Sequence, residues 1–129
     1  MRRVVMRMAG GLGNQLFQYA VGLALAEARG ARLLLDTTTY RKDKLRTFGL
    51  EPFALTPRFV PRPCVPFMAA FDKRFIGRVL RTSLPLVGWY YVRDRSHGYE
   101  PDRFPPGGNL ILDGYWQSDR YFSPVAALP

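Results

Sequence analysis

The sequence predicts an α/β domain with a parallel sheet, and a few features of its 129 residues support that prediction. Two short apolar runs, residues 3–8 and 32–36, have the character of buried strands and flank a long stretch rich in Ala and Leu. Glycines separate the first run from this helical stretch. Strand, glycine turn, helix and strand form a βαβ unit, whose strands are parallel and whose crossover is right-handed. A third apolar run, residues 110–113, extends the predicted sheet.

The predicted helix of this unit has sequence signals at both ends. Asn14 is a suitable N-cap, while Arg29 in the last turn and Gly30 directly after it favour a stop at that point. From Leu16 to Ala26 the helix is apolar on nearly all sides. We therefore expect it to be buried rather than to lie on the surface.

The middle of the chain predicts weaker elements. Five prolines in residues 52–66 predict an extended connector without a regular element. Residues 67–82 place apolar side chains at helical spacing, which predicts one amphipathic helix that ends before Pro85. Such a helix either packs on the domain with a hydrated basic face or lies on a membrane surface, and both alternatives stay open. Residues 87–92 suit a further strand.

Composition and charge argue against several classes of protein. A hydrophobic fraction of 47% is not that of a disordered chain. The single cysteine, Cys64, excludes an internal disulfide and a cysteine zinc cluster. The net charge is +9, but no run of five like charges occurs, so a nucleic-acid binder is the least favoured class. Because neither a membrane span nor a secretory signal is evident, we expect a cytoplasmic protein, with peripheral contact at the inner membrane as an open alternative.

The glycine turn before the helix indicates where chemistry takes place. Glycine lets a backbone approach a ligand closely, and the N–H groups of a helix start favour an anion such as a diphosphate. A dinucleotide fingerprint would use Gly11, Gly13 and the acid Asp36, but Leu16 stands where the third glycine is needed. A P-loop is excluded because no lysine precedes Lys42. An NAD-binding domain and a tight turn without a ligand both stay open at this point.

Two blocks of the sequence carry a resemblance to a known family. Residues 10–20 (GGLGNQLFQYA) resemble the N-terminal signature of the α-1,2-fucosyltransferases of glycosyltransferase family 11. Residues 112–122 (LDGYWQSDRYF) are similar to that family's aspartate-glycine-tyrosine-aromatic-glutamine-serine segment, and residues 99–101 are similar to a tyrosine-acid-proline stretch before it. The blocks have the order and approximate spacing of the family, so the resemblance spans the chain.

The resemblance implies an inverting glycosyltransferase that needs neither a metal nor another cofactor. Members of the family transfer L-fucose from GDP-fucose to the 2-hydroxyl of a galactoside, and bacterial members build surface polysaccharides. The expected partners are therefore GDP-fucose and a galactose-containing glycan. Residues 1–129 correspond by this resemblance to a single N-terminal Rossmann-like domain of a two-Rossmann, GT-B type enzyme.

The resemblance also implies which residues line the substrate cleft. They lie in the two blocks and are Gly10, Gly11, Gly13, Asn14, Gln15, Asp113 and Gln117. Asn14 is the first choice for a contact with the donor, and Gln15 shares that task. Asp113 and Gln117 are candidates at the cleft edge, or else they only stabilise the junction of strand and loop.

One departure from the family pattern bears on activity. Members have a histidine-x-arginine motif downstream of the second block, and its arginine is expected to hold the donor diphosphate. The one histidine of this chain, His97, stands in another context. We therefore expect a truncated chain that lacks the C-terminal donor-binding half, exposes apolar surface and is inactive alone. A non-catalytic domain that binds a sugar nucleotide is the alternative.

Overall fold

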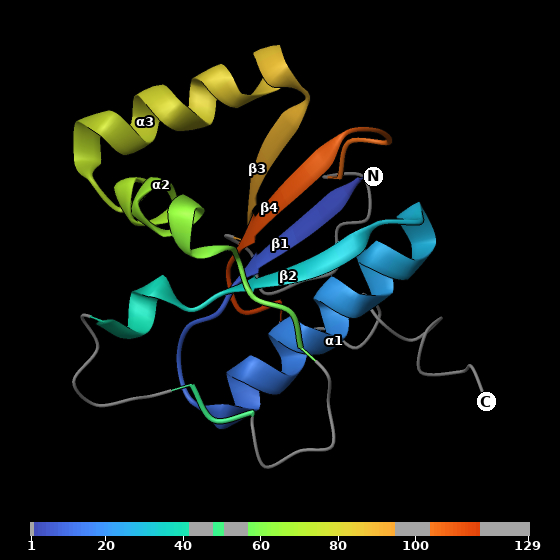
Figure 1. Ribbon diagram of the computed structural model, residues 1–129. Coiled ribbons are helices and arrows are strands. Elements are labelled where there is room, and N and C mark those ends of the chain that lie inside the picture. Colours follow the sequence, from blue (N-terminus) through green and yellow to red (C-terminus); the bar gives the residue numbers. More distant parts are fainter. Residues whose placement is uncertain (1, 42–47, 51–56, 95–103, 117–129) are drawn as a thin grey trace.

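A four-stranded parallel sheet forms the centre of the domain, with strand order β2-β1-β4-β3 (Figure 1). The computed structural model describes residues 2–41, 48–50, 57–94 and 104–116. The strands are β1 (Arg3–Arg7), β2 (Arg32–Asp36), β3 (Trp89–Arg93) and β4 (Asn109–Asp113). The α/β, Rossmann-like class and the parallel βαβ unit that the sequence predicts are confirmed.

Helix α1 (Leu12–Arg29) joins β1 to β2 and covers one face of the sheet (Figure 1). Apolar side chains from this helix, from the strands and from the following segments form one core. They are Val4, Met6, Met8, Val21, Ala26, Leu35, Leu50, Val92, Leu110, Leu112 and Trp116. Gly30, with φ of 60°, ends the helix as predicted, because glycine adopts this left-handed conformation without a steric penalty.

The start and the exposure of α1 differ from the prediction. Gly11 is the N-cap and the helix begins at Leu12, so the prediction of Asn14 as the N-cap was wrong. The N–H of Gln15 already donates to the carbonyl of Gly11 at 3.0 Å, which places Asn14 inside the first turn. Leu12 and Leu16 are 46% and 39% exposed, so the helix is not buried on all sides. A helix that covers one face of a sheet has an outer side, and these residues lie there.

The opposite face of the sheet is covered by short helices (Figure 1). They are the 3₁₀ turn η2 (Arg62–Cys64), α2 (Val65–Ala70), α3 (Arg74–Ser83) and the 3₁₀ turn η3 (Leu84–Val87). A second core fills this side and consists of Val5, Met68, Phe71, Leu84 and Ile111. The sheet is thus packed on both faces, as the near-continuous apolar character of its strands requires.

Two predictions for the middle of the chain need correction. The prediction that residues 52–66 hold no regular element was wrong, because η2 and the start of α2 lie there. Pro66 falls in the first turn of α2, where a missing N–H costs nothing. The prediction of one helix over residues 67–82 was also wrong, although the stop before Pro85 is confirmed. The chain breaks between α2 and α3, where Lys73 has an extended backbone with ψ of 137°, and Gly77 then packs on the carbonyl of Phe71, to which a Cβ at Gly77 would come within 2.4 Å.

Candidate functional site

The two sequence blocks meet at the carboxyl ends of the neighbouring strands β1 and β4. Gln18, in α1, donates through Nε2 to the carbonyl of Gly114 at 2.8 Å, although 96 residues separate the two. Its Oε1 accepts the N–H of Ala9 at 3.1 Å, so one amide joins both strand ends. A Cβ placed on Gly10 would lie 2.9 Å from the ring of Tyr115. The first block therefore packs directly against the start of the second.

The turn at Gly10 requires glycine. Its φ of +81° lies in the left-handed region, and a Cβ there would approach Nδ2 of Asn14 to 2.9 Å. The carbonyl of Gly10 accepts two hydrogen bonds, from Nε2 of Gln15 at 3.1 Å and from the hydroxyl of Tyr40 at 3.0 Å. These contacts fix the direction in which the chain enters α1.

Gln15 lies beneath this turn. It is only 1% exposed, and its Oε1 accepts the N–H of Gly49 at 2.8 Å while its Nε2 donates to Gly10. Both ends of the amide thus bind backbone groups. Gln15 therefore stabilises the glycine turn, and a contact between its side chain and the donor substrate stays a prediction.

The start of α1 is the open part of the site. Gly13 is exposed, and nothing in the described structure lies within 4 Å of a Cβ built on it. The N-cap residue, Gly11, makes no side-chain cap bond, and the first turn of the helix contains no acid. The N–H groups of Leu12, Gly13 and Asn14 precede the first bond of the helix ladder, so this end carries partial positive charge. Its chemistry suits an anion such as a phosphate.

A row of alternating charges lies on the other face of the sheet, at the last residue of each strand. In sheet order it consists of Asp36, Arg7, Asp113 and Arg93, which are register partners from strand to strand. Nε of Arg7 lies 2.8 Å from Oδ2 of Asp36, and both side chains are almost completely buried. The other end of the guanidinium binds both carboxylate oxygens of Asp72, at 3.0 and 3.1 Å.

Tyr91 connects the two halves of this charged row. Its hydroxyl accepts a hydrogen bond from Nη1 of Arg7 at 3.0 Å and donates one to Oδ2 of Asp113 at 2.7 Å. Burial raises the pKa of Tyr91 to about 12, with a further contribution from the carboxylate of Asp113 and an opposing one from Arg7. Burial lowers the pKa of Arg7, but its bonds to Asp72, Tyr91 and Asp36 outweigh this and raise it overall. Arg7 therefore stays charged and Tyr91 stays protonated.

The raised pKa of Tyr91 predicts a loss of stability in alkali. The protonated hydroxyl is favoured in the folded state, so its contribution is complete below pH 10 and disappears as the pH rises from 10 through 12. After allowance for solvent screening, we expect about 1–2 kcal/mol. The measurement is the free energy of unfolding from pH 8 to 12 for the wild type and Tyr91→Phe. The difference between the two proteins should shrink over that interval, and a constant difference would contradict this assignment.

Several predicted residues are not brought to the open end of α1. The carboxylate of Asp113 lies in the charged row, bound to Tyr91 and 3.6 Å from Nε of Arg93. Asp36, on which the NAD-binding alternative rests, is 1% exposed and held by Arg7 and the N–H of Thr38. It is therefore not free to bind a ribose. Gln117, His97 and the stretch 99–101 lie outside the described residues.

The sequence interpretation missed the residues that hold the site together. Gln18 is completely buried and ties the two blocks, and Arg7 organises the charged row. A signal for Gln18 exists, because a second glutamine three residues after Gln15 lies on the same side of an apolar helix. Within the described part of the chain, no three His, Cys, Asp or Glu side chains gather as a metal would require. No helix described by the structure is long and apolar enough to cross a membrane.

Comparison with known proteins connects this site to a class of enzyme. No family model matches the chain. The chain is 35% identical over 121 residues to an alpha-1,2-colitosyltransferase of Escherichia coli. This match covers 92% of the chain but only 40% of the enzyme, so the chain spans less than half the length of the relative. The chain is thus similar over nearly its whole length to part of an α-1,2-glycosyltransferase, which agrees with the resemblance that the two sequence blocks carry.

Proposed function

We propose that this chain forms part of the active site of a glycosyltransferase that moves L-fucose from GDP-fucose to the 2-hydroxyl of a galactoside. The observation that carries the proposal is the meeting of the two sequence blocks, joined by the 2.8 Å bond from Gln18 to Gly114. It lies at the carboxyl ends of parallel strands, where α/β sheets bind their ligands. The colitosyltransferase relative supports the reaction class and the α-1,2 linkage, and it acts with a different sugar.

The proposed reaction is a displacement with inversion. The acceptor 2-hydroxyl oxygen bonds to the anomeric carbon, the bond from that carbon to the phosphate oxygen breaks, and GDP leaves with the electron pair. The hydroxyl proton passes to a base. The role of this chain is to hold the diphosphate at the start of α1, where Gly13 leaves space and Asn14 supplies an amide. We assign no base, because Arg7 and Tyr91 already engage Asp36 and Asp113.

The test is titration of the chain with GDP and with GDP-fucose by calorimetry. Gly13→Ala should lower GDP affinity about tenfold, because its methyl group enters the proposed phosphate space. Its stability should stay equal or rise by about 0.5–1 kcal/mol, as is usual for Gly to Ala in a helix. Asn14→Ala should weaken binding by a similar factor. Gly107→Ala is the matched control, because its Cβ is also unobstructed and it lies near Arg29, at the other end of α1.

The titrations and a transfer assay separate the outcomes. If neither nucleotide binds to this chain or to a longer chain that corresponds to the whole relative, or if Gly107→Ala weakens binding as much as Gly13→Ala, the proposed donor site is wrong. Nucleotide binding without transfer to a galactoside is expected from this chain alone. If a longer chain that corresponds to the full length of the relative also binds the nucleotides without transferring the sugar, the non-catalytic alternative is favoured. In that longer chain, fucosyl and colitosyl donors should be compared, because a preference for colitose would overturn the sugar proposed here.

A further inference from the structure

Most of the large apolar side chains that the structure leaves exposed lie in one helical layer. Among the described residues, six of the ten belong to this layer: Phe67, Phe75, Ile76, Val79, Leu86 and Val87. The most exposed are Leu86 at 87%, Phe75 at 76% and Val87 at 71%. Apolar groups that gather in this way mark an interaction surface.

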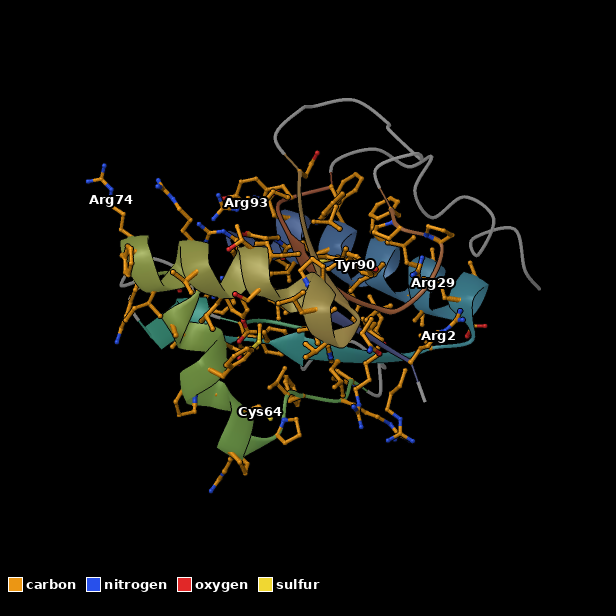
Figure 2. The ribbon with its side chains drawn as sticks, turned by 90° about the horizontal axis from the view of Figure 1, so that it is seen from above. Arg2, Arg29, Cys64, Arg74, Tyr90 and Arg93 are labelled. Carbon is orange, nitrogen blue, oxygen red and sulfur yellow. The ribbon has the colours of Figure 1, made fainter. Side chains whose placement is uncertain are left out.

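The same layer is strongly basic. Residues 62–87, from η2 to η3, contain five Arg or Lys residues and a single acid, Asp72. Arg7 holds both carboxylate oxygens of Asp72, so this acid does not neutralise its neighbours in sequence. Arg74 extends outward from the end of α3 (Figure 2). Within the described residues, no ion pair involves Arg74 or Arg78. The layer therefore presents apolar and cationic groups together.

Helix α3 places these groups in two parallel stripes. Phe75 and Val79 are one turn apart, and so are Arg74 and Arg78, so that a basic stripe runs beside an apolar one. The inner side of α3 is fixed, because Gly77 packs on the carbonyl of Phe71. The helix therefore cannot turn its apolar stripe inward without losing this close contact.

The apolar surface continues into a cavity of about 390 Å³ between α2, η3 and the sheet. Its lining is almost entirely apolar and includes Val5, Leu34 and Ile111 from the strands. Phe67 and Val87 belong both to the lining and to the exposed surface, so the cavity opens onto that surface. Its size and lining suit part of an acyl chain.

We propose that the outer side of α3 and η3 docks this protein on an anionic lipid membrane, with its bases at the head groups and its apolar stripe among the acyl chains. A helix that is basic on one side and apolar on the other is typical of interfacial binding, and anionic lipid attracts it. A second copy of the chain fits less well, because two such surfaces would bring like charges together. The proposal does not depend on the transferase function.

The test is flotation of the chain with lipid vesicles. Wild type should float with vesicles of phosphatidylcholine and about 30% phosphatidylglycerol, and should remain unbound with phosphatidylcholine alone or in high salt. Arg74→Gln with Arg78→Gln should lower partitioning about twenty-five-fold, since each base is worth about fivefold near an anionic surface. Phe75→Ser with Val79→Ser should lower it at least about tenfold.

Matched pairs control for charge and apolar area. Arg2→Gln with Arg32→Gln removes the same charge elsewhere, and Leu12→Ser with Leu16→Ser removes exposed apolar groups from α1. Both pairs should float nearly as well as wild type, and circular dichroism should show every variant folded. Equal losses in the control pairs, or equal binding to neutral vesicles, would overturn the proposal. A different result would assign the surface to a second copy of the chain. In that case wild type would not bind vesicles and would run as a dimer in size-exclusion chromatography, and Phe75→Ser with Val79→Ser would abolish the dimer.

Discussion

Replacement of Arg7 by methionine is expected to lower the free energy of unfolding by about 3–5 kcal/mol, the range observed when one partner of a buried ion pair is removed. Asp36 is 1% exposed, and its carboxylate binds Arg7 and the N–H of Thr38. Without Arg7, only the bond from the N–H of Thr38 would remain of these two. Its carboxylate would then be a buried charge without its cation, while Asp72, which is partly exposed, would lose less. The measurement is urea unfolding at neutral pH.

Two comparisons isolate the buried charge as the cause. Arg2→Met removes an exposed arginine from the same end of the chain and should change stability by less than about 0.5 kcal/mol. Arg7→Met combined with Asp36→Asn removes the charge that Arg7 neutralised and keeps an oxygen for the N–H of Thr38. The double variant should recover about 1–3 kcal/mol of the loss. If it is no more stable than Arg7→Met alone, packing of the arginine rather than its charge is responsible.

Replacement of Gln18 by leucine is expected to cost about 2–4 kcal/mol. Leucine has a similar volume, but it leaves the N–H of Ala9 and the carbonyl of Gly114 without this amide, at about 1–2 kcal/mol for each group. Because Gln18 lies in the first block and Gly114 in the second, GDP affinity should fall together with stability. Thermal unfolding and the titration described above measure the two effects.

Gln18→Glu gives a sharper form of this prediction. The carboxylate keeps an acceptor for Ala9 but turns a second oxygen toward the carbonyl oxygen of Gly114. Protonation would restore a donor, so the folded-state pKa of this glutamate is expected to rise. Relative to wild type, this variant should then be most stable below about pH 4 and lose stability as the pH rises through the raised value. A variant with the pH profile of wild type would show that Gln18 does not join the blocks.

The sheet was largely predictable because its signals are local. Apolar runs bounded by glycines, and Gly30 after the last turn of α1, depend on neighbours in sequence. The break between α2 and α3 was not predictable, because the contact that accompanies it, of Gly77 with the carbonyl of Phe71, is not shown by helical periodicity. The periodicity of residues 67–82 continues across the break, so the sequence alone suggests one helix.

The candidate site was predictable in its location but not in its contacts. The block at residues 10–20 identifies the glycine turn, and the structure shows the open helix start there. The place of Asp113 depends on which strands neighbour β4, and the order β2-β1-β4-β3 is not encoded in any local pattern. The sequence left open whether Asp113 lies at the cleft edge or stabilises the junction of strand and loop; the structure shows its carboxylate bound to Tyr91, and a role at the cleft edge stays a prediction.

The alternating charges at the strand ends also determine how the strands can align. Successive side chains of a strand point to opposite faces, so a slip of one residue would move a charge from this row into the apolar core under α1. A slip of β1 would place Arg7 there, away from Asp36 and Asp72, and would leave both acids without their cation. The parallel strands are far apart in sequence and have no hairpin to set their alignment. The charged row supplies that alignment, since only the native register pairs every charge with its opposite.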